Sequence, residues 1–229
     1  MNVRPLLLVN TMLVAAMAAV SAWTWSQIPD NAQIPVHWNL EGQVDRFGSK
    51  FEALLLFPAL LTLVTLIMAI IPRFDPRREN LEASGKFWNA ATILIGLLLA
   101  YTHGLLTWTA LGHSVDMTNA LVPALCILFA GIGNYLGKTK SNWFGGVRTP
   151  WTMSSEYSWE KTHRLAGYMF MLTSAATFTA WLAVGAMPAF IVLFAAMMLT
   201  VLTSFVMSYV YWRNDPDRST AQPKQSERT

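Results

Sequence analysis

Charge is scarce in this sequence: 13% of its 229 residues are Asp, Glu, Lys or Arg, whereas 54% are hydrophobic. A soluble domain of this size needs far more polar surface, so the composition excludes that class and predicts a membrane protein. The formal net charge of +3 does not indicate nucleic-acid binding, because the lysines and arginines lie between long apolar runs. We therefore expect membrane lipids as partners and no direct contact with nucleic acid.

Cysteine is nearly absent too. The single one, Cys126, cannot form a disulfide within the chain, so no covalent bridge is expected to hold an outer loop. It lies inside an apolar run and is interpreted as a small apolar filler. The sequence also lacks a nucleophile–base signature, a phosphate-binding glycine loop and zinc-ligand spacing. We accordingly predict a protein that is not an enzyme, with no catalytic residues, no cofactor and no metal.

Acidic residues are missing from the middle of every apolar run, although the chain has thirteen of them. Proton and cation pathways usually need an ionisable group inside the membrane, so an ion-coupled transporter is disfavoured. His103 is the one deep candidate, and we expect a neutral, hydrogen-bonded residue at a helix contact, with a proton relay as the alternative. Asn10, Asn89 and Asn134 are likewise expected to hydrogen-bond between helices.

Six apolar runs are long enough to cross a bilayer as helices, since about 20 residues span the hydrocarbon core. They cover residues 6–25, 53–71, 87–111, 120–136, 165–185 and 187–212. We predict an all-α, polytopic membrane protein: a bundle of six transmembrane helices with one structured outer loop and a short cytoplasmic helical segment. The predicted parts are a helix pair over 1–80 with the outer loop 26–52, a four-helix region over 81–212, and a disordered cytoplasmic tail over 213–229.

The first run has an alternative interpretation. Arg4 precedes its apolar core and Val20-Ser21-Ala22 resembles a signal-peptide cleavage site. The run continues through Trp23 and Trp25, which is long for a signal peptide, so an uncleaved helix is favoured.

The connections between the runs differ in positive charge. The side with both termini, loop 72–86 and the central stretch carries 14 lysines and arginines, and the opposite side carries 2. Cytoplasmic loops are rich in Lys and Arg, so we predict a multi-pass protein of the inner (cytoplasmic) membrane with both termini in the cytoplasm. Only the outer loop 26–52 is long enough to carry an outer site.

That outer loop reads SQIPDNAQIPVHWNLEGQVDRFGSKFE. Its prolines favour extended backbone and its glycines suit turns, so residues 34–38 are predicted to be extended. We expect a compact loop over the outer helix ends, with Trp38 and Phe47 reaching into the membrane interface. A metal site formed by His37, Asn39, Glu41 and Asp45 is the weaker alternative. The candidate residues are Pro35, His37, Trp38, Asn39, Gly42, Asp45 and Gly48.

The central stretch, residues 142–167, reads NWFGGVRTPWTMSSEYSWEKTHRLAG. So many large side chains exceed what a simple connection needs, although tryptophan and arginine also collect at membrane interfaces without any site. Thr149 and Pro150 can begin a helix as its N-cap and first residue, and Thr152 is an equally good cap. We expect Trp151 and Trp159 to share one face of this helix and to pack beneath the membrane helices.

A second face of the same predicted helix would join Glu156, Glu160 and His163. Arg148 precedes the helix and follows two glycines, so it is suited to a bidentate acceptor. The candidate acceptors are Glu156, Glu160 and the phosphate of a lipid or ligand. The E-x-x-H step ending at His163 matches di-iron bundles, but the second motif that such a fold needs is absent.

Two groups of residues carry a resemblance to known families. Gly133-Asn134, Asn142, Gly146, Arg148-Thr149-Pro150-Trp151-Thr152, Trp159 and His163 resemble the SdpI family of bacterial immunity proteins. The outer pattern Pro35-x-His37-Trp38-Asn39 with Gly42, Asp45 and Gly48 resembles the small N-terminal domain of unknown function fused to that family. The resemblance implies a six-helix inner-membrane protein that protects against a secreted, membrane-active peptide toxin. It also implies, in some members, a receptor that holds a transcriptional repressor at the membrane.

Three functions remain open at this point. The first is a non-enzymatic immunity or signalling protein that meets a peptide toxin outside and a repressor inside. The second is a membrane-embedded enzyme or lipid-handling protein with a site around Arg148 and His163, and the third is a small permease. The candidate cytoplasmic motif consists of Asn134, Asn142, Gly146, Arg148, Thr149, Pro150, Trp151, Glu156, Trp159 and His163.

Overall fold

Six long helices dominate the computed structural model, which describes residues 1–39 and 42–218. They are α1 (Arg4–Gln27), α2 (Lys50–Ile70), α4 (Gly85–Ala110), α5 (Met117–Leu136), α7 (Glu156–Val184) and α8 (Ala186–Arg213). Each is long and apolar enough to cross a membrane. The six predicted spans are therefore confirmed, with α7 starting nine residues before the predicted 165.

The remaining elements are short. The first connection forms two antiparallel strands, β1 (Ile34–Trp38) and β2 (Val44–Gly48), so the predicted extended segment is confirmed. A 3-10 turn (Ile71–Arg73) and helix α3 (Arg78–Ala83) join α2 to α4, and helix α6 (Pro150–Ser154) precedes α7. After α8, Pro216–Arg218 form another 3-10 turn, and the rest of the predicted tail lies outside the described residues.

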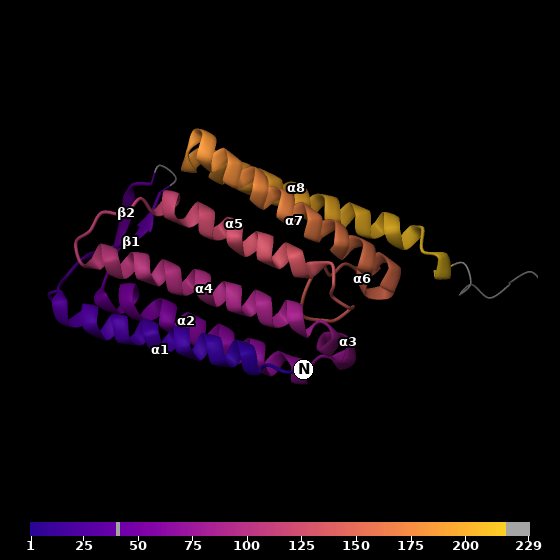
Figure 1. The fold of residues 1–229 in the computed structure, drawn as a ribbon, viewed down its shortest axis with the longest axis horizontal. Helices are drawn as coiled ribbons and strands as arrows, with labels where there is room; N and C mark the ends of the chain where they lie inside the picture. The colour runs from indigo at the N-terminus through magenta and orange to yellow at the C-terminus, as the bar shows by residue number, and fades with distance from the viewer. Residues whose placement is uncertain (40–41, 219–229) are drawn as a thin grey trace, which may run out of the picture.

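The long helices form two groups of three, which run side by side in Figure 1. Helices α1, α2 and α4 pack on one another, α5, α7 and α8 pack on one another, and α4 against α5 joins the groups. The β1–β2 hairpin lies at one end of the bundle, which we call the hairpin end (Figure 1). The chain start, α3 and α6 lie at the opposite end, the loop end.

Small residues let the helices of the second group approach closely. A Cβ atom added to Gly133 of α5 would lie 2.7 Å from the carbonyl oxygen of Gly167 in α7, so the two backbones touch there. Between α7 and α8, Ser158 donates to the carbonyl of Ser208 at 2.7 Å. Only Gly185 separates α7 from α8, and its φ of +90° suits glycine alone.

Buried polar side chains tie the first group together. Ser21 of α1 donates to the carbonyl of Leu54 in α2 at 2.6 Å and lies 2.9 Å from Nε2 of His103 in α4. His103 therefore lies at a contact of three helices, as predicted. Asn10 reaches Thr65 of α2 at 3.0 Å, which confirms its interhelical role, and Asn89 reaches the carbonyl of Asn2 at 3.0 Å. Asn134 departs from this prediction, since it is exposed on α5.

Candidate functional site

A tightly folded loop, residues 139–149, lies at the loop end and carries four residues of the predicted central motif, Asn142, Gly146, Arg148 and Thr149. Asn142 is buried and organises it: its side-chain oxygen accepts from the N–H groups of Phe144 at 3.0 Å and Gly145 at 2.7 Å. Its amide donates back to the carbonyl of Lys140 at 2.9 Å. All three bonds are local, so Asn142 fixes the shape of the loop rather than facing a ligand.

His163 of α7 fastens this loop to the bundle. The ring is fully buried; Nε2 accepts from the N–H of Val147 at 2.9 Å, and Nδ1 donates to the carbonyl of Trp159 at 2.8 Å. These partners assign the proton to Nδ1 and leave neither nitrogen free. Gly146, with a φ of +107°, passes directly over the ring, where a Cβ atom would overlap Nε2. Both features of Gly146 require glycine.

Trp159 completes this contact. Its ring stacks on that of His163 with centroids 3.9 Å apart, and its indole N–H donates to the carbonyl of Thr139 at 3.1 Å. Only 1% of Trp159 is exposed. Its place as a packing residue agrees with the prediction.

The helix predicted from Thr149 is broken in two. Thr149 and Pro150 do begin a helix, α6, with a reciprocal capping box to Thr152. However, Ser155 is extended and caps a new helix, α7, by accepting from the N–H of Ser158 at 2.9 Å. Its hydroxyl also donates to Asp215 at 2.5 Å, which holds the break in place. A single helix through this stretch was therefore a wrong prediction.

The break separates the two tryptophans. Trp151 lies on α6 and packs edge-on against Phe205 and Tyr209 of α8, with ring centroids 5.2 and 5.1 Å away. Trp159 lies on α7, so the predicted shared face does not exist. Both rings still pack against the protein.

The predicted protein acceptors of Arg148 were also wrong. Its guanidinium donates to the carbonyl of Trp143, and the side chain is exposed. Glu160 pairs instead with Arg164 at 2.5 Å, one helical turn away. Glu156 is exposed in the first turn of α7, where a carboxylate complements the helix N-terminus. His163 is buried, so these two glutamates do not join it in a site.

At the hairpin end, the candidate outer residues form the β1–β2 turn and its flanks. Asn39 accepts from the N–H of Gly42 through its backbone at 3.0 Å and from the N–H of Gln43 through its side chain at 2.8 Å. His37 and Asp45 pair across the strands at 2.6 Å, and both are largely exposed. Among the described residues no three metal-ligating side chains come together; Glu41, the other predicted ligand, lies outside them.

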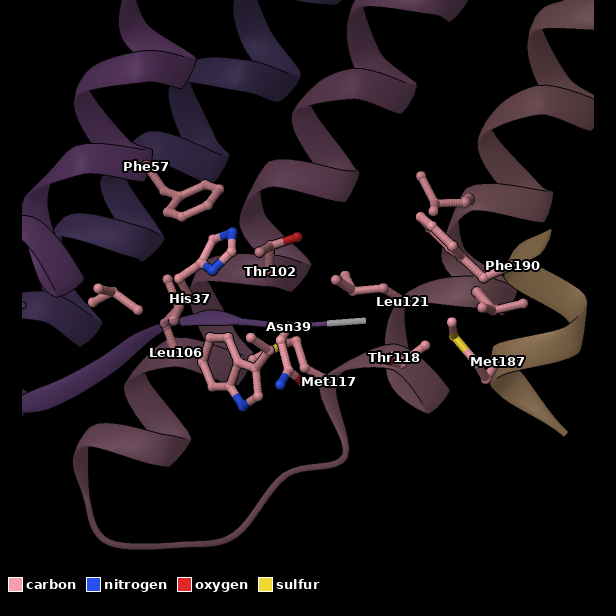
Figure 2. Close-up of a pocket in the computed structure, with 14 residues that line it drawn as sticks. His37, Asn39, Phe57, Thr102, Leu106, Met117, Thr118, Leu121, Met187 and Phe190 are labelled. Atoms are coloured by element: carbon pink, nitrogen blue, oxygen red, sulfur yellow. The ribbon is translucent and has the colours of Figure 1, made fainter. Parts of the chain in front are cut away.

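A pocket of about 290 Å³ lies beneath the hairpin. Figure 2 shows His37 and Asn39 at one side of it, facing Phe57 of α2, Thr102 of α4 and Leu121 of α5. The other lining residues are Val36, Trp38, Leu106, Met117, Thr118, Val122, Leu125, Met187 and Phe190. The wall is mostly apolar with a few polar groups, the composition of many ligand sites.

Comparison with protein families assigns both parts of this architecture. Residues 138–208 match the SdpI/YfhL protein family, and residues 12–62 match a domain of unknown function, DUF1648. The chain thus has a region that matches DUF1648, followed by a region that matches the SdpI/YfhL family. The resemblance drawn from the sequence is thereby confirmed. No match was found among curated proteins or among solved structures.

The SdpI/YfhL region contains the whole central motif except Asn134, and DUF1648 contains all seven outer-loop candidates. The structure gathers Gly146, Trp159 and His163 into one contact, and Asn142 shapes the loop that this contact holds. Asn134 and Glu156 lie apart from it. The pocket in Figure 2 is lined by DUF1648, by the SdpI/YfhL region and by the helices α4 and α5 between them.

Four polar residues of the α2–α4 connection, which the sequence analysis had not singled out, hydrogen-bond to loop 139–149 and to α6 and form a clamp on them. Asp75 is buried and accepts from the N–H of Trp143 at 3.1 Å. Arg77 donates to the hydroxyl of Ser141 and to the carbonyl of Met153, the latter at 2.7 Å. Two further bonds complete the clamp: Asn80 to the carbonyl of Ser141 at 2.9 Å, and the N–H of Lys140 to Ser84 at 2.8 Å. In the sequence Asp75 and Arg77 stood only as loop charges, and no spacing paired any of the four residues with partners 56 to 76 positions away.

Proposed function

We propose that this protein is a non-enzymatic membrane immunity protein, which protects the cell against a secreted, membrane-active peptide. Membership of the SdpI/YfhL family supports an immunity-type role in a multi-pass membrane protein. The observation that carries the proposal is the pocket at the hairpin end. DUF1648 and the later helices both line it, so the pocket is formed only when the two regions are joined.

The hairpin end is proposed to face outward, because the 14-to-2 distribution of Lys and Arg favours a cytoplasmic loop end. In this orientation a peptide arriving from outside meets the pocket directly. An apolar side chain of the peptide would enter between Phe57, Leu121 and Phe190, with His37 and Asn39 available for polar contacts at the rim. Reporter fusions at residues 42 and 154 test the orientation, and a cytoplasmic signal at 42 would reverse it.

The test of the function is survival. A sensitive bacterial strain expressing the protein is exposed to a panel of purified membrane-active peptides, and we expect one of them to lose potency. Leu121→Trp fills the pocket and should abolish the protection. Leu199→Trp on α8 is the matched control, because Leu199 is exposed on the apolar surface of the bundle.

Both variants are first checked for insertion and melting in detergent. Protection by Leu121→Trp equal to wild type would remove the pocket from the proposal. Unchanged survival of the wild-type strain against the whole panel would contradict the immunity role itself.

Two other activities carry less support. An enzyme or lipid-handling site around Arg148 and His163 would need accessible groups, whereas both His163 nitrogens bind the backbone. Retention of a transcriptional repressor at the loop end stays a prediction from the family resemblance. Its test is whether a repressor encoded beside the gene moves to the membrane when the peptide is present.

A further inference from the structure

A second hollow, separate from the pocket under the hairpin, lies between α5 and α7 near the loop end. It measures about 330 Å³ and is far more polar than the pocket under the hairpin. Two cationic side chains line it, together with an amide and a phenol. The lining residues are Gly133, Asn134, Gly137, Lys138, Arg164, Gly167, Tyr168 and Met171.

Close backbone contact brings the two cations together. A Cβ atom added to Gly137 would lie 3.1 Å from the Cα of Arg164, so the end of α5 rests on α7 at that residue. Lys138 is the next residue along the chain and Arg164 is the residue contacted. The glycines allow this close approach of α5 and α7, and the hollow lies beside the contact.

The charges in the hollow are only partly compensated. Lys138 forms no ion pair with a carboxylate of the described residues, and its ammonium lies 5.4 Å from the ring of Tyr135. Arg164 pairs with Glu160 through Nη2 at 2.5 Å, which leaves its other N–H groups available. The last carbonyl groups of α5 would repel an anion at this helix end. Two of them, those of Tyr135 and Leu136, already accept from the N–H groups of Lys138 and Thr139, which reduces this repulsion.

We propose that this hollow binds a phosphate group, and that its source is the headgroup of an anionic phospholipid. Arginine offers a planar pair of donors to phosphate and lysine adds a point charge. Asn134 supplies an amide donor and Tyr168 a hydroxyl, while Met171, a turn further along α7, offers an apolar surface for the first part of an acyl chain. Basic hollows between helices at the cytoplasmic surface suit such headgroups, and this assignment does not depend on protection against a peptide.

The test uses the full chain in detergent. Wild-type protein is titrated with phosphatidylglycerol or with phosphatidylcholine, and retained lipid is measured by native mass spectrometry. We expect preferential retention of phosphatidylglycerol, and the double variant K138Q/R164Q should lose about tenfold in apparent affinity for it. The matched control is K140Q/K161Q, which removes the same charge from two nearby lysines outside the hollow and should bind like wild type.

Glu160→Gln provides a result that misfolding cannot imitate. It removes the carboxylate that competes for Arg164, so phosphatidylglycerol should bind several-fold more tightly. Inorganic phosphate and glycerol phosphate are then added as competitors. If these competitors displace phosphatidylglycerol only at a concentration much higher than that of the lipid, the site is assigned to a lipid. If they displace it at an equal concentration, the site is assigned to a free phosphate compound. Equal retention of both lipids by wild type, or equal loss in K140Q/K161Q and K138Q/R164Q, would overturn the proposal.

Discussion

At the loop end, three polar side chains of the motif and the α2–α4 connection bind the backbone of distant segments, whereas on the β1–β2 hairpin a polar pair lies at the surface. His163, Asp75 and Arg77 all bond to main-chain groups of residues 143–153. His37 and Asp45, by contrast, pair across two strands with 61% and 41% of their side chains exposed. The first arrangement fixes the conformation of residues 143–153, and the second leaves two polar side chains accessible to a ligand.

This difference suggests that the loop end serves mainly stability and the hairpin end mainly recognition. Removing a buried partner leaves an unsatisfied main-chain group, so changes at the loop end should appear first as lost stability. Exposed ion pairs contribute little to folding, so changes at the hairpin end should appear first as lost protection. Substitutions at both ends, ordered by expected effect, test this contrast.

The largest effect is expected from Gly146→Ala. The new Cβ would overlap Nε2 of His163, and the φ of +107° is unfavourable for alanine as well. We expect a loss of about 3 kcal/mol or more in the free energy of unfolding, measured by melting in detergent, because strain and overpacking add.

Gly112→Ala separates these two causes. Gly112 also has a positive φ, +90°, but nothing lies within 4 Å of its added Cβ. Strain alone should cost about 1–2 kcal/mol there. Equal losses in both variants would mean that the contact with His163 contributes nothing.

A smaller effect is expected from Arg77→Met, which removes the donors to Ser141 and Met153. The expected loss in the free energy of unfolding is about 2 kcal/mol, because the half-buried carbonyl of Met153 and the buried hydroxyl of Ser141 lose their donor. Arg78→Met is the control, since Arg78 is exposed and pairs only with the exposed Glu82. It should change melting by less than about 0.5 kcal/mol, and a similar loss in both variants would refute the clamp.

The sequence predicted the spans well because their signal is one of length and apolarity, which the bilayer imposes on each helix separately. The cap at Thr149 and Pro150 was also predictable, since it depends on neighbours in the chain. The break at Ser155 was not, although serine is a good cap. Its extended backbone is held by Asp215, sixty residues away, and a single sequence does not show such a partner.

The candidate sites were predictable only as sets of residues. Gly146 and His163 were both singled out, but the direct contact between them depends on how the loop folds back onto α7. Arg148 was given Glu156 and Glu160 as candidate acceptors, but its guanidinium donates to the carbonyl of Trp143 and Glu160 pairs with Arg164. Asp75 and Arg77 gave no local signal because their partners lie within residues 141–153, after the intervening helices α3, α4 and α5.

A change confined to function is expected from Asp45→Asn. It weakens the pair with His37, whose ring faces the pocket in Figure 2, while both groups stay largely in solvent. Melting should change by less than about 0.5 kcal/mol, and peptide protection should fall. Glu52→Gln, which breaks the exposed pair with Arg46 outside the pocket, is the control and should protect normally. Equal protection by both variants would remove His37 from the recognition site.

The smallest effect is expected from Arg148→Lys. The acceptor of this side chain is the carbonyl of Trp143, not a carboxylate, and the side chain is exposed. An ammonium group can donate to a single carbonyl as a guanidinium does, and the positive charge at the loop end is kept. Melting should therefore stay within about 0.5 kcal/mol of wild type, and protection should be unchanged. Normal melting with lost protection would instead show that the planar guanidinium meets a ligand or partner, and the loop end would then be a binding surface as well as a fixed scaffold.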